Sequence, residues 1–487
     1  MLDDLDVHGI AHCSWKSNEH LAAALAGETD LDLLVDHDAH SAFHAVAARH
    51  GLKQLVPPSE AAFPGMEHLL GFDRPSGRLF HLHVHYQLVL GEQFVKNHRL
   101  PIEREMLRDT RRQDGVRVAR PELELAVLVI RALLKYRARD FVKDLLGVRS
   151  PGIRDALLTE LHWLLDRTDD ATVRATLAAC SALPTDIVCD FLVATARTRR
   201  PAIAYLRLRR RTRSWLGDRA RVSRARALTT YGVAVVRRHR RRTFPRMTPV
   251  GGGGSLALVG ADGAGKSTAA CAVAEWLGWK VDTRVAYLGS KPPSRAARAT
   301  YLAFRTCRRG ERALAERYGA DGLATRAVRE TRNASRALNQ YAVGRQRARA
   351  YAVAQRDSAR GCMVVLDRFP CGTLVPHADG ALLDGPQIVA TAGPRPNRAV
   401  RLLAAAEEHL YGRFPPPDAI VVLDVDPVTA FGRKPDHDPG VLRAKSSAAE
   451  VLSRREGRAG PRIRTIDANQ SFDRVVSDVK SELWRVV

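Results

Sequence analysis

Short apolar runs separated by longer helical patterns organise the chain from residue 251 onward. Runs rich in Val, Leu and Ile are typical of buried parallel strands, and they occupy 256–259, 285–288, 363–366, 420–423 and 463–466. The stretches between and after them have helical patterns at 269–277, 296–360 and 471–484. This alternation predicts an α/β domain with a doubly wound parallel sheet over 251–487. Ligands of such sheets bind beyond the carboxyl ends of the strands.

The first 200 residues have a different pattern. Residues 31–35 and 79–86 have residue patterns typical of β-strands. Residues 39–49 are rich in alanine and are predicted to form a helix. A helical pattern starts at Pro121 and continues to about residue 196. Proline is favoured in the first turn of a helix, so Pro121 is a suitable starting residue. We therefore predict an α+β domain over 1–120 with a helical extension over 121–196.

Turn-forming residues mark the clearest domain boundary. Pro245, Pro249 and the glycines at 251–254 interrupt the pattern immediately before the C-terminal sheet. The preceding residues, 197–250, are expected to form an Arg-rich helical connector. At 487 residues the chain is long enough for two or three domains, each with its own core.

Composition adds a strong and uneven positive charge. The chain has 77 Lys and Arg residues against 53 Asp and Glu residues, a net charge of +24. Between residues 197 and 246 there are 18 arginines and one acidic residue, Asp218. One interpretation is a polyanionic partner, such as nucleic acid, an anionic membrane surface or an acidic glycan. The other is a solvated helix filled with arginine by coding bias, because a charge block alone selects no partner.

The cellular compartment is predicted from the absence of membrane-spanning, secretory and disulfide signals in the sequence. No run of about 18 apolar residues occurs, and the chain starts with acidic residues, Asp3 and Asp4, where a secretory signal would be basic. The 7 cysteines have neither zinc-type nor redox-type paired spacing, and an odd number argues against a disulfide framework. We expect a cytoplasmic protein with reduced thiols.

A phosphate-loop motif, G-x-x-x-x-G-K-[ST], is the most informative feature of the chain. It lies between the predicted strand 256–259 and the predicted helix 269–277, and it reads Gly260-Ala261-Asp262-Gly263-Ala264-Gly265-Lys266-Ser267-Thr268. Phosphates would there meet the unpaired N–H groups of a helix N-terminus. Lys266 would reach the β- and γ-phosphates and the Ser267 hydroxyl would bind Mg²⁺. The sequence therefore predicts a site for ATP and Mg²⁺, rather than a glycine-rich turn without a ligand.

Further motifs follow the phosphate loop in a fixed order. They are Leu366-Asp367-Arg368-Phe369, the segment 417–427 with Arg433-Lys434 after it, and Ile466-Asp467-Ala468-Asn469. In this combination the chain resembles the thymidylate kinase branch of the P-loop nucleoside monophosphate kinases over roughly 256–487. The resemblance implies transfer of a phosphoryl group from ATP to a small-molecule acceptor, often itself a phosphate. We also expect a homodimer.

The resemblance further implies roles for single residues. Arg368 would grip the acceptor phosphate with its planar guanidinium, and Asp367 would organise Mg²⁺ waters or the acceptor. The alternative for this pair is a local ion pair at a strand end. Asp262 would lie inside the loop, where relatives carry an acid.

The resemblance also suggests roles for charged residues outside these motifs. A mobile lid would bring positive charge over the phosphates through Arg433, Lys434, Arg443 and Lys445. Arg345 and Arg347 are further candidates on the acceptor side. Asp424 and Asp426 are expected to serve as a strand-end cap and a turn rather than as metal ligands.

Two departures from the thymidylate kinase pattern concern the acceptor. Residues 288–293 read Leu-Gly-Ser-Lys-Pro-Pro where an Arg-Glu-Pro-Gly-like element is expected, and no Ala-Tyr-Gln segment follows Phe369. We therefore expect an acceptor other than dTMP. It would be a nucleotide, such as a nucleoside monophosphate, or a phosphorylated or hydroxylated metabolite, such as a sugar phosphate or another surface-sugar precursor.

The N-terminal domain is similar to the opening of nucleotidyltransferase-fold domains over about 1–120. The similarity rests on 12–18, His-Cys-Ser-Trp-Lys-Ser-Asn, and on the Asp30-Leu31-Asp32 strand start. Two carboxylates two residues apart on a strand point to one face, where they could share a divalent metal with a triphosphate. The alternative for Asp30 and Asp32 is a solvated strand end. Trp15-Lys16-Ser17 stands where relatives have a Gly-Ser turn. A second interpretation is therefore that this site has lost its catalytic activity.

Histidine is concentrated in this domain. Of 17 histidines, 12 lie before residue 100, and His81, His83 and His85 alternate along the predicted strand 79–86, where relatives place a third acid. Such a row could bind a metal or a phosphorylated ligand. We favour a polar strand face, because no thiolate or carboxylate with zinc-ligand spacing lies nearby in the sequence.

Two functions follow from these features. The first is an ATP-dependent phosphotransferase fused to a nucleotidyltransferase-like domain. The second is an anion-binding scaffold that uses ATP as a switch and engages nucleic acid or membrane through 197–246. Asp367, Arg368 and the lid-like basic cluster favour the enzyme, because phosphoryl transfer needs them and simple binding does not.

Overall fold

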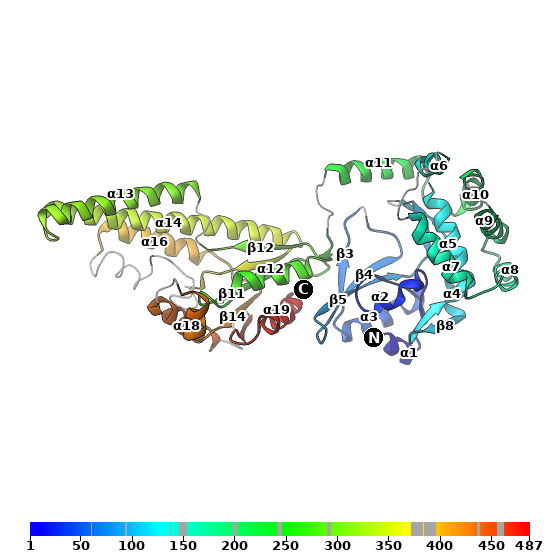
Figure 1. Cartoon of the computed structure of the whole chain (residues 1–487), viewed down its shortest axis with the longest axis horizontal. Helices are drawn as coiled ribbons and strands as arrows, with labels where there is room; N and C mark the ends of the chain where they lie inside the picture. Colours follow the sequence, from blue (N-terminus) through cyan, green and yellow to red (C-terminus); the bar gives the residue numbers. More distant parts are fainter. Residues whose placement is uncertain are drawn as a thin grey trace. The chain divides into compact units, whose positions relative to one another are not determined.

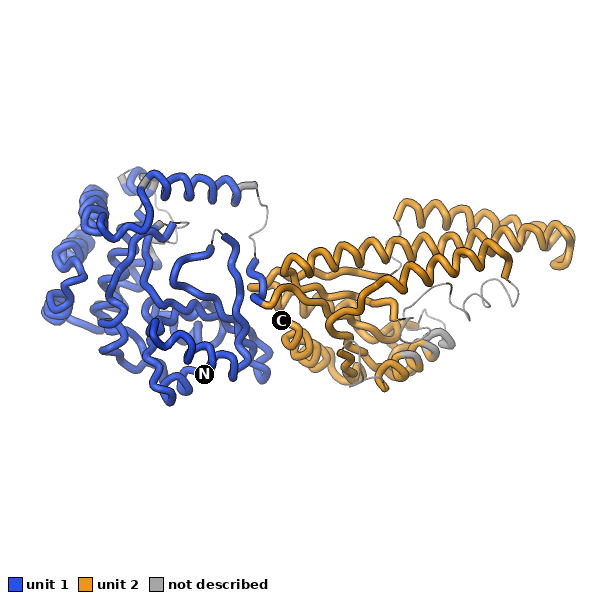
Figure 2. Tube along the Cα trace, turned by 180° about the vertical axis from the view of Figure 1, so that it is seen from behind, with its two compact units in different colours: residues 1–250 blue, residues 251–487 orange. Residues whose placement is uncertain are grey.

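The chain folds into two compact units, residues 1–250 and 251–487 (Figure 2). The division falls at the glycine run from which the sequence predicts a domain boundary. A computed structural model describes 1–59, 61–92, 95–136, 138–145, 153–197, 202–240, 246–289, 294–371, 383, 396–435, 439–454 and 462–487. Each unit combines helices with a sheet, so the chain belongs to the α/β class.

Unit 1 is built on a mixed eight-stranded sheet with the order β10-β3-β4-β5-β2-β1-β9-β8. Its strands are β1 (His12–Ser14), β2 (Leu31–Val35), β3 (Lys53–Val56), β4 (Met66–Asp73), β5 (Arg78–His85), β8 (Thr110–Gln113), β9 (Val116–Ala119) and β10 (Thr248–Pro249). The β2–β5 and β1–β9 pairs are parallel, and the other pairs are antiparallel. A separate hairpin joins β6 (Val89–Glu92) to β7 (Val95–Arg99).

The two faces of this sheet have different partners. Leu33 and Leu82 pack into an apolar cluster with residues of α1 (Leu2–Val7), α2 (Leu21–Leu25) and α3 (His40–Arg49). Leu34 belongs to a second cluster that extends into the helices after residue 120. Because successive strand residues point to opposite faces, Asp32 lies on the face of Leu34. Asp32 therefore lies on the face of the sheet opposite to the one covered by α1, α2 and α3.

The helical part of unit 1 is centred on one buried helix, α5 (Pro121–Lys135), in which every residue from Pro121 to Ile130 is buried. A helix that is buried all round forms the middle of a bundle. It contacts α7 (Ile153–Leu165), α8 (Asp170–Ala179), α9 (Thr185–Arg197) and α10 (Ala202–Trp215). Of the two other helices, α4 (Glu103–Arg108) contacts β1 and β2, and α6 (Ala138–Leu145) contacts α10. The Arg-rich segment, which starts at the last residue of α9, thus contains α10 and the largely exposed α11 (Arg224–Arg240).

Unit 2 contains a parallel five-stranded sheet with the order β12-β13-β11-β14-β15. The strands are β11 (Ser255–Gly260), β12 (Thr283–Tyr287), β13 (Met363–Asp367), β14 (Ala419–Asp424) and β15 (Arg462–Asp467). Each of the five apolar runs in the sequence forms one of these strands. The phosphate-loop motif follows the central strand, β11, and Asp367 ends the neighbouring strand β13.

Helices cover both faces of this sheet. α14 (Leu323–Ala359) and α18 (Pro439–Ser453) share an apolar cluster with one face, while α12 (Lys266–Leu277) and α19 (Phe472–Val486) contact the sheet and each other. The remaining helices are α13 (Arg295–Tyr318), α16 (Arg398–Gly412) and α17 (Pro427–Arg433). Layers on both faces are what a doubly wound fold requires.

The predicted helical stretch 296–360 consists of two helices. α13 ends before Gly319, whose φ of 77° is a left-handed conformation that glycine adopts readily. The chain then turns and α14 runs back beside α13 (Figure 1). Among the described residues, no helix combines the length and the apolar character needed to span a bilayer.

Candidate functional site

The phosphate-loop residues form a tight turn between β11 and α12. Gly260, Gly263 and Gly265 have φ angles of 144°, 93° and 87°, a region that side chains disfavour. A Cβ atom at Gly260 would lie 2.4 Å from the Leu423 carbonyl oxygen, and one at Gly263 would lie 2.8 Å from that of Ala430. The backbone therefore curves closely against β14 and α17, and it delivers the chain to the N-terminus of α12 at Lys266.

Lys266 turns back into the curve of the loop. Its side chain is buried, with 4% of the residue exposed, and its Nζ donates to the carbonyl oxygens of Gly260 and Ala261, each at 2.8 Å. Ser267 and Thr268, in the first turn of α12, are exposed. The ammonium group thus lies within the loop while the two hydroxyl-bearing residues face outward.

Asp262 joins the loop to two other parts of unit 2. Its Oδ1 accepts a hydrogen bond from Arg368 Nη2 at 2.8 Å, and its Oδ2 accepts one from Lys445 Nζ at 2.6 Å. Burial disfavours the charged carboxylate, but these two cations and Lys266 hold the pKa of Asp262 well below its ordinary value. Asp262 is therefore a carboxylate that ties the loop to the end of β13 and to α18.

Replacing Asp262 by Asn is expected to destabilise nucleotide-free unit 2 by on the order of 1–3 kcal/mol, because two partly buried cations lose their partner. Since the pKa of Asp262 is lowered on folding, this contribution is present at pH 7 and is lost on acidification below the ordinary carboxyl range. Urea unfolding of both proteins at pH 7 measures the effect. Asp321→Asn, which breaks an exposed ion pair with Arg326, is the control and should leave stability unchanged; equal effects of the two substitutions would contradict the prediction.

Asp367 and Arg368 lie at the rim of the loop. Asp367 is 4% exposed, and its Oδ1 is buried without a hydrogen-bond partner in the described part of the chain. Such a buried oxygen requires an explanation, and a bound cation or its water would provide one. Arg368 has a φ of 75°, which is unusual for a residue with a side chain. Its guanidinium forms an ion pair with Asp262 across the loop.

The lid-like basic residues divide into two groups. Arg433, at the end of α17, donates to the carbonyl oxygens of Ala468 at 3.0 Å and Gly263 at 3.4 Å, and Lys445 holds Asp262. Both therefore lie against the loop. Lys434 and Arg443 are exposed.

The other charged candidates of unit 2 have mainly structural contacts. Arg347 is buried in α14 and donates to the Tyr411 hydroxyl of α16 at 3.3 Å, whereas Arg345 is exposed. Asp426 caps α17 by accepting from the backbone N–H groups of Val428 and Thr429, which confirms its predicted role in a turn. Burial raises the pKa of Asp424, as does the nearby Asp467. Residues 290–293 and 372–382, where the acceptor-side departures lie, fall outside the described residues.

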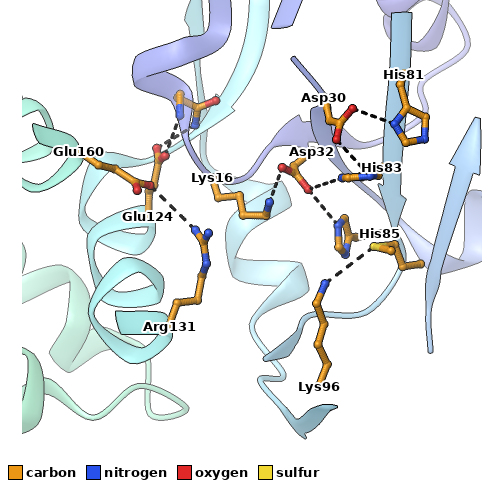
Figure 3. Close-up of polar contacts among 12 residues, drawn as sticks. Lys16, Asp30, Asp32, His81, His83, His85, Lys96, Glu124, Arg131 and Glu160 are labelled. Carbon is orange, nitrogen blue, oxygen red and sulfur yellow. Dashed lines mark hydrogen bonds and ion pairs between the residues drawn. The ribbon is translucent and has the colours of Figure 1, made fainter. Parts of the chain in front are cut away.

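A second polar cluster lies in unit 1 around Asp30 and Asp32 (Figure 3). Asp32 of β2 is in register with His83 of the parallel neighbour β5. The Oδ1 atom of Asp32 is 3.3 Å from both His83 Nδ1 and His85 Nε2, and its Oδ2 forms an ion pair with Lys16. The structure thus brings the two predicted carboxylates together with the predicted histidine row.

Lys16 changes what this cluster can bind. Burial disfavours ionised Asp32, but Lys16 and the histidines hold the pKa of that carboxyl well below its usual range. Burial lowers the pKa of Lys16 itself and, aided by the charge of Lys16, lowers the pKa of Lys96 to about 8. A divalent cation at Asp32 would therefore have to compete with an ammonium group that already neutralises this carboxylate.

The turn after β1 is held by α5. Asn18 donates to Glu124 through its backbone N–H at 3.1 Å and through Nδ2 at 2.8 Å. Ser17 has a φ of 58°, and burial raises the pKa of Glu124 to about 7. These contacts fix the Trp15-Lys16-Ser17 turn, and the sequence gives no local sign of them because Glu124 lies more than 100 residues away.

Unit 1 is expected to lose stability on acidification between pH 6.5 and pH 4. Burial lowers the pKa of His68 to about 3 and that of His85 to about 4. Unfolding therefore takes up protons at both histidines in this range, and each of them lowers stability by up to about 1.4 kcal/mol per pH unit. The raised pKa of Glu124 has the opposite sign and offsets one of these two protons above the ordinary pKa of a glutamate. Urea unfolding of unit 1 in the intact protein, with EDTA, measures the slope. The slope of stability against pH should be smaller in His68→Gln than in the wild-type protein. It should be unchanged in the control His20→Gln, whose side chain is exposed. A wild-type stability that does not change between pH 6.5 and pH 4 would contradict the prediction.

Comparison with known proteins gives a partial match. No family model matches the chain. The "Uncharacterized ATP-binding protein YghR" of Escherichia coli (strain K12) is 27% identical over 230 residues, which cover 47% of this chain and 85% of the relative. The "Uncharacterized ATP-binding protein YghS" of the same strain is 28% identical over 234 residues, 45% of this chain and 88% of the relative. Both relatives carry ATP binding in their names, and the match covers most of the length of each of them.

Proposed function

We propose that unit 2 is an ATP-dependent phosphotransferase of the thymidylate kinase type. The observation that carries the proposal is the joint arrangement of the phosphate loop, Asp367 and Arg368, which the Asp262 carboxylate connects. A parallel sheet with this loop after its central strand is the arrangement in which P-loop proteins hold nucleotides. The names of the curated relatives support ATP binding, and the phosphoryl transfer is our inference from the residues at the rim of the loop.

The donor side is assigned to the loop. The backbone N–H groups at the start of α12 would receive the phosphates, and Lys266 would exchange its bonds to the two loop carbonyl oxygens for phosphate oxygens. Ser267 is exposed beside it, and Asp367 has a buried Oδ1 without a hydrogen-bond partner among the described residues, so both side chains are suited to hold Mg²⁺. The cation would neutralise charge on the transferred group.

The acceptor side is assigned to Arg368. Its guanidinium is held by Asp262, so an acceptor phosphate would compete with that carboxylate for a fork of two N–H donors. Arg433 would add positive charge from α17. The acceptor class remains a phosphorylated small molecule, either a nucleoside monophosphate or a sugar phosphate.

For unit 1 we propose a nucleotidyltransferase-like fold with a degenerate metal site. The Asp30 and Asp32 carboxylates share one face of the sheet, as metal ligands would. Lys16 neutralises Asp32 in the position where a divalent cation would do so. On this account Mg²⁺ and a triphosphate enter the site only if Lys16 moves away.

One assay tests the proposal for unit 2. The full-length protein is incubated with ATP and Mg²⁺ and a panel of nucleoside monophosphates and sugar phosphates, and ADP, pyrophosphate and phosphorylated products are measured. The proposal predicts ADP in equal amounts with one phosphorylated acceptor. ADP formation that depends on DNA, RNA or anionic vesicles, without such a product, would overturn it in favour of the scaffold, and pyrophosphate release would show that unit 1 turns over nucleotide.

A further inference from the structure

Three histidines of unit 1 meet on the sheet face that carries Asp30 and Asp32. His81 and His83 are two residues apart on β5, so both side chains point to this face. His68 of the antiparallel neighbour β4 lies directly opposite His83. The ring centroids are 4.7 Å apart for His81 and His83, 4.9 Å for His68 and His83, and 5.2 Å for His68 and His81.

The nitrogen atoms of these rings have the spacing of ligands on one ion. One nitrogen from each ring can be chosen so that all three lie within 4.8 Å of one another. His68 Nδ1 and His81 Nε2 are 3.2 Å apart. Two nitrogens bound at about 2.0–2.1 Å to a tetrahedral zinc ion lie roughly 3.3 Å apart. The two nitrogens also lie within hydrogen-bond distance of each other, so an ion bound to both would take the place of the proton that they share.

Asp30 fixes the proton arrangement that metal binding needs. Its Oδ1 is 2.9 Å from His81 Nδ1 (Figure 3). Because a carboxylate only accepts hydrogen bonds, Nδ1 of His81 carries the proton, and the lone pair of the neutral ring is on Nε2, which faces His68. A carboxylate that orients an imidazole through its second nitrogen is the usual support of a metal-bound histidine.

Hydrogen bonding accounts for only one nitrogen of His68, because its Nδ1 lies within hydrogen-bond distance of His81 Nε2. The residue is 6% exposed, and its Nε2 is buried with no hydrogen-bond partner among the residues that the structure describes. Buried polar atoms without partners are rare in folded proteins. His68 is thus a buried imidazole beside two others, and hydrogen bonds among the described residues leave its Nε2 without a partner.

We propose that His68, His81 and His83 form a binding site for Zn²⁺ or a similar transition-metal ion, with Asp30 positioning His81. Three imidazole ligands leave a fourth coordination position, as in catalytic rather than structural zinc sites. The side chains of His83 and Asp30 are 22% and 28% exposed, so this position is accessible to water or an anionic ligand. Mg²⁺ prefers oxygen ligands, and the three nitrogens therefore select against it.

The inference is independent of phosphoryl transfer in unit 2, and unit 1 contains a comparison cluster. His40 and His44, one turn apart on α3, both contact Glu67, at 3.2 Å and 2.7 Å. These residues could also hold a metal ion. An ion bound there would have two imidazole ligands and one carboxylate ligand, whereas an ion at His68, His81 and His83 would have three imidazole ligands. The ligand set therefore shows which cluster holds a bound ion.

The test is a titration of EDTA-treated full-length protein with Co²⁺ and Zn²⁺, followed by the visible absorption of bound Co²⁺ and by X-ray absorption of bound Zn²⁺. One ion with three imidazole ligands is expected in the wild-type protein. His83→Gln should abolish this site, Asp30→Asn should weaken it about 10–100-fold, and the control His44→Gln should leave it unchanged.

Two results would overturn the proposal. One is wild-type protein that binds neither ion, and the other is a bound ion with two imidazoles and a carboxylate that is lost in His44→Gln but retained in His83→Gln. The X-ray absorption measurement uses the wild-type protein alone, so it decides the ligand set even where His83→Gln fails to fold. Circular dichroism identifies that failure.

Discussion

Lys266→Met is expected to lower phosphoryl transfer by unit 2 about 10²–10³-fold. The substitution keeps most of the apolar stem but removes the ammonium group that would stabilise charge on the β- and γ-phosphates. In the structure this ammonium lies 2.8 Å from two loop carbonyl oxygens, so it is already positioned within the loop. The rate of ADP formation with the acceptor identified in the panel is the measurement.

The control for this prediction is Lys280→Met. Lys280 follows the other end of α12 and packs over the Trp279 ring, away from the loop residues, and its replacement should leave the rate unchanged. Circular dichroism and the unfolding midpoint establish that both variants are folded. A folded Lys266→Met protein with the wild-type rate would show that transfer does not use the phosphate loop.

Arg368→Lys is expected to lower kcat/KM for the acceptor about 10²-fold while leaving the affinity for ATP nearly unchanged. Lysine keeps the positive charge beside Asp262, so the loop retains its partner, but it lacks the planar fork that matches a phosphate. Steady-state kinetics with varied acceptor, together with a separate ATP-binding measurement, distinguish the two effects.

The matched control is Arg356→Lys, an exposed arginine of α14 that should tolerate the same exchange. If Arg368→Lys weakens ATP binding as much as it slows transfer, Arg368 supports the donor loop and does not bind the acceptor. The Asp262 contact then becomes the main role of Arg368.

Much of unit 2 could be predicted from the sequence because its signals are local. Each strand is a short apolar run, and the phosphate loop needs glycines at Gly260, Gly263 and Gly265, where the structure has positive φ angles. The break of 296–360 into two helices was also present in the sequence as Gly319 and Gly322. A helical pattern that continues on both sides of such glycines does not by itself show a turn.

The contacts that complete the phosphate-loop site could not be predicted in detail. Asp262 binds Lys445, which is 183 residues later in the chain, and Arg368, which is 106 residues later. Lys445 could be placed in a basic lid by resemblance, but its carboxylate partner depends on how α18 packs against the sheet. Such pairings arise from tertiary structure and leave no periodic pattern in the sequence.

Unit 1 shows the same division between local and long-range signals. The strand 31–35 was predicted with the bounds that β2 has, and the row of His81, His83 and His85 was recognised from its alternation. His68 was not singled out, because only the antiparallel pairing of β4 with β5 places it opposite His83. The ion pair of Lys16 with Asp32 likewise depends on the turn after β1, which Glu124 holds from α5.

The central claim is that the glycine loop of unit 2 binds ATP, and calorimetric titration of the nucleotide-free wild-type protein with ATP and Mg²⁺ tests it most directly. The account predicts saturable binding of one ATP per chain, which Lys266→Met weakens strongly. Folded wild-type protein that shows no saturable heat of ATP binding would contradict the assignment of the loop and the proposed phosphotransferase with it.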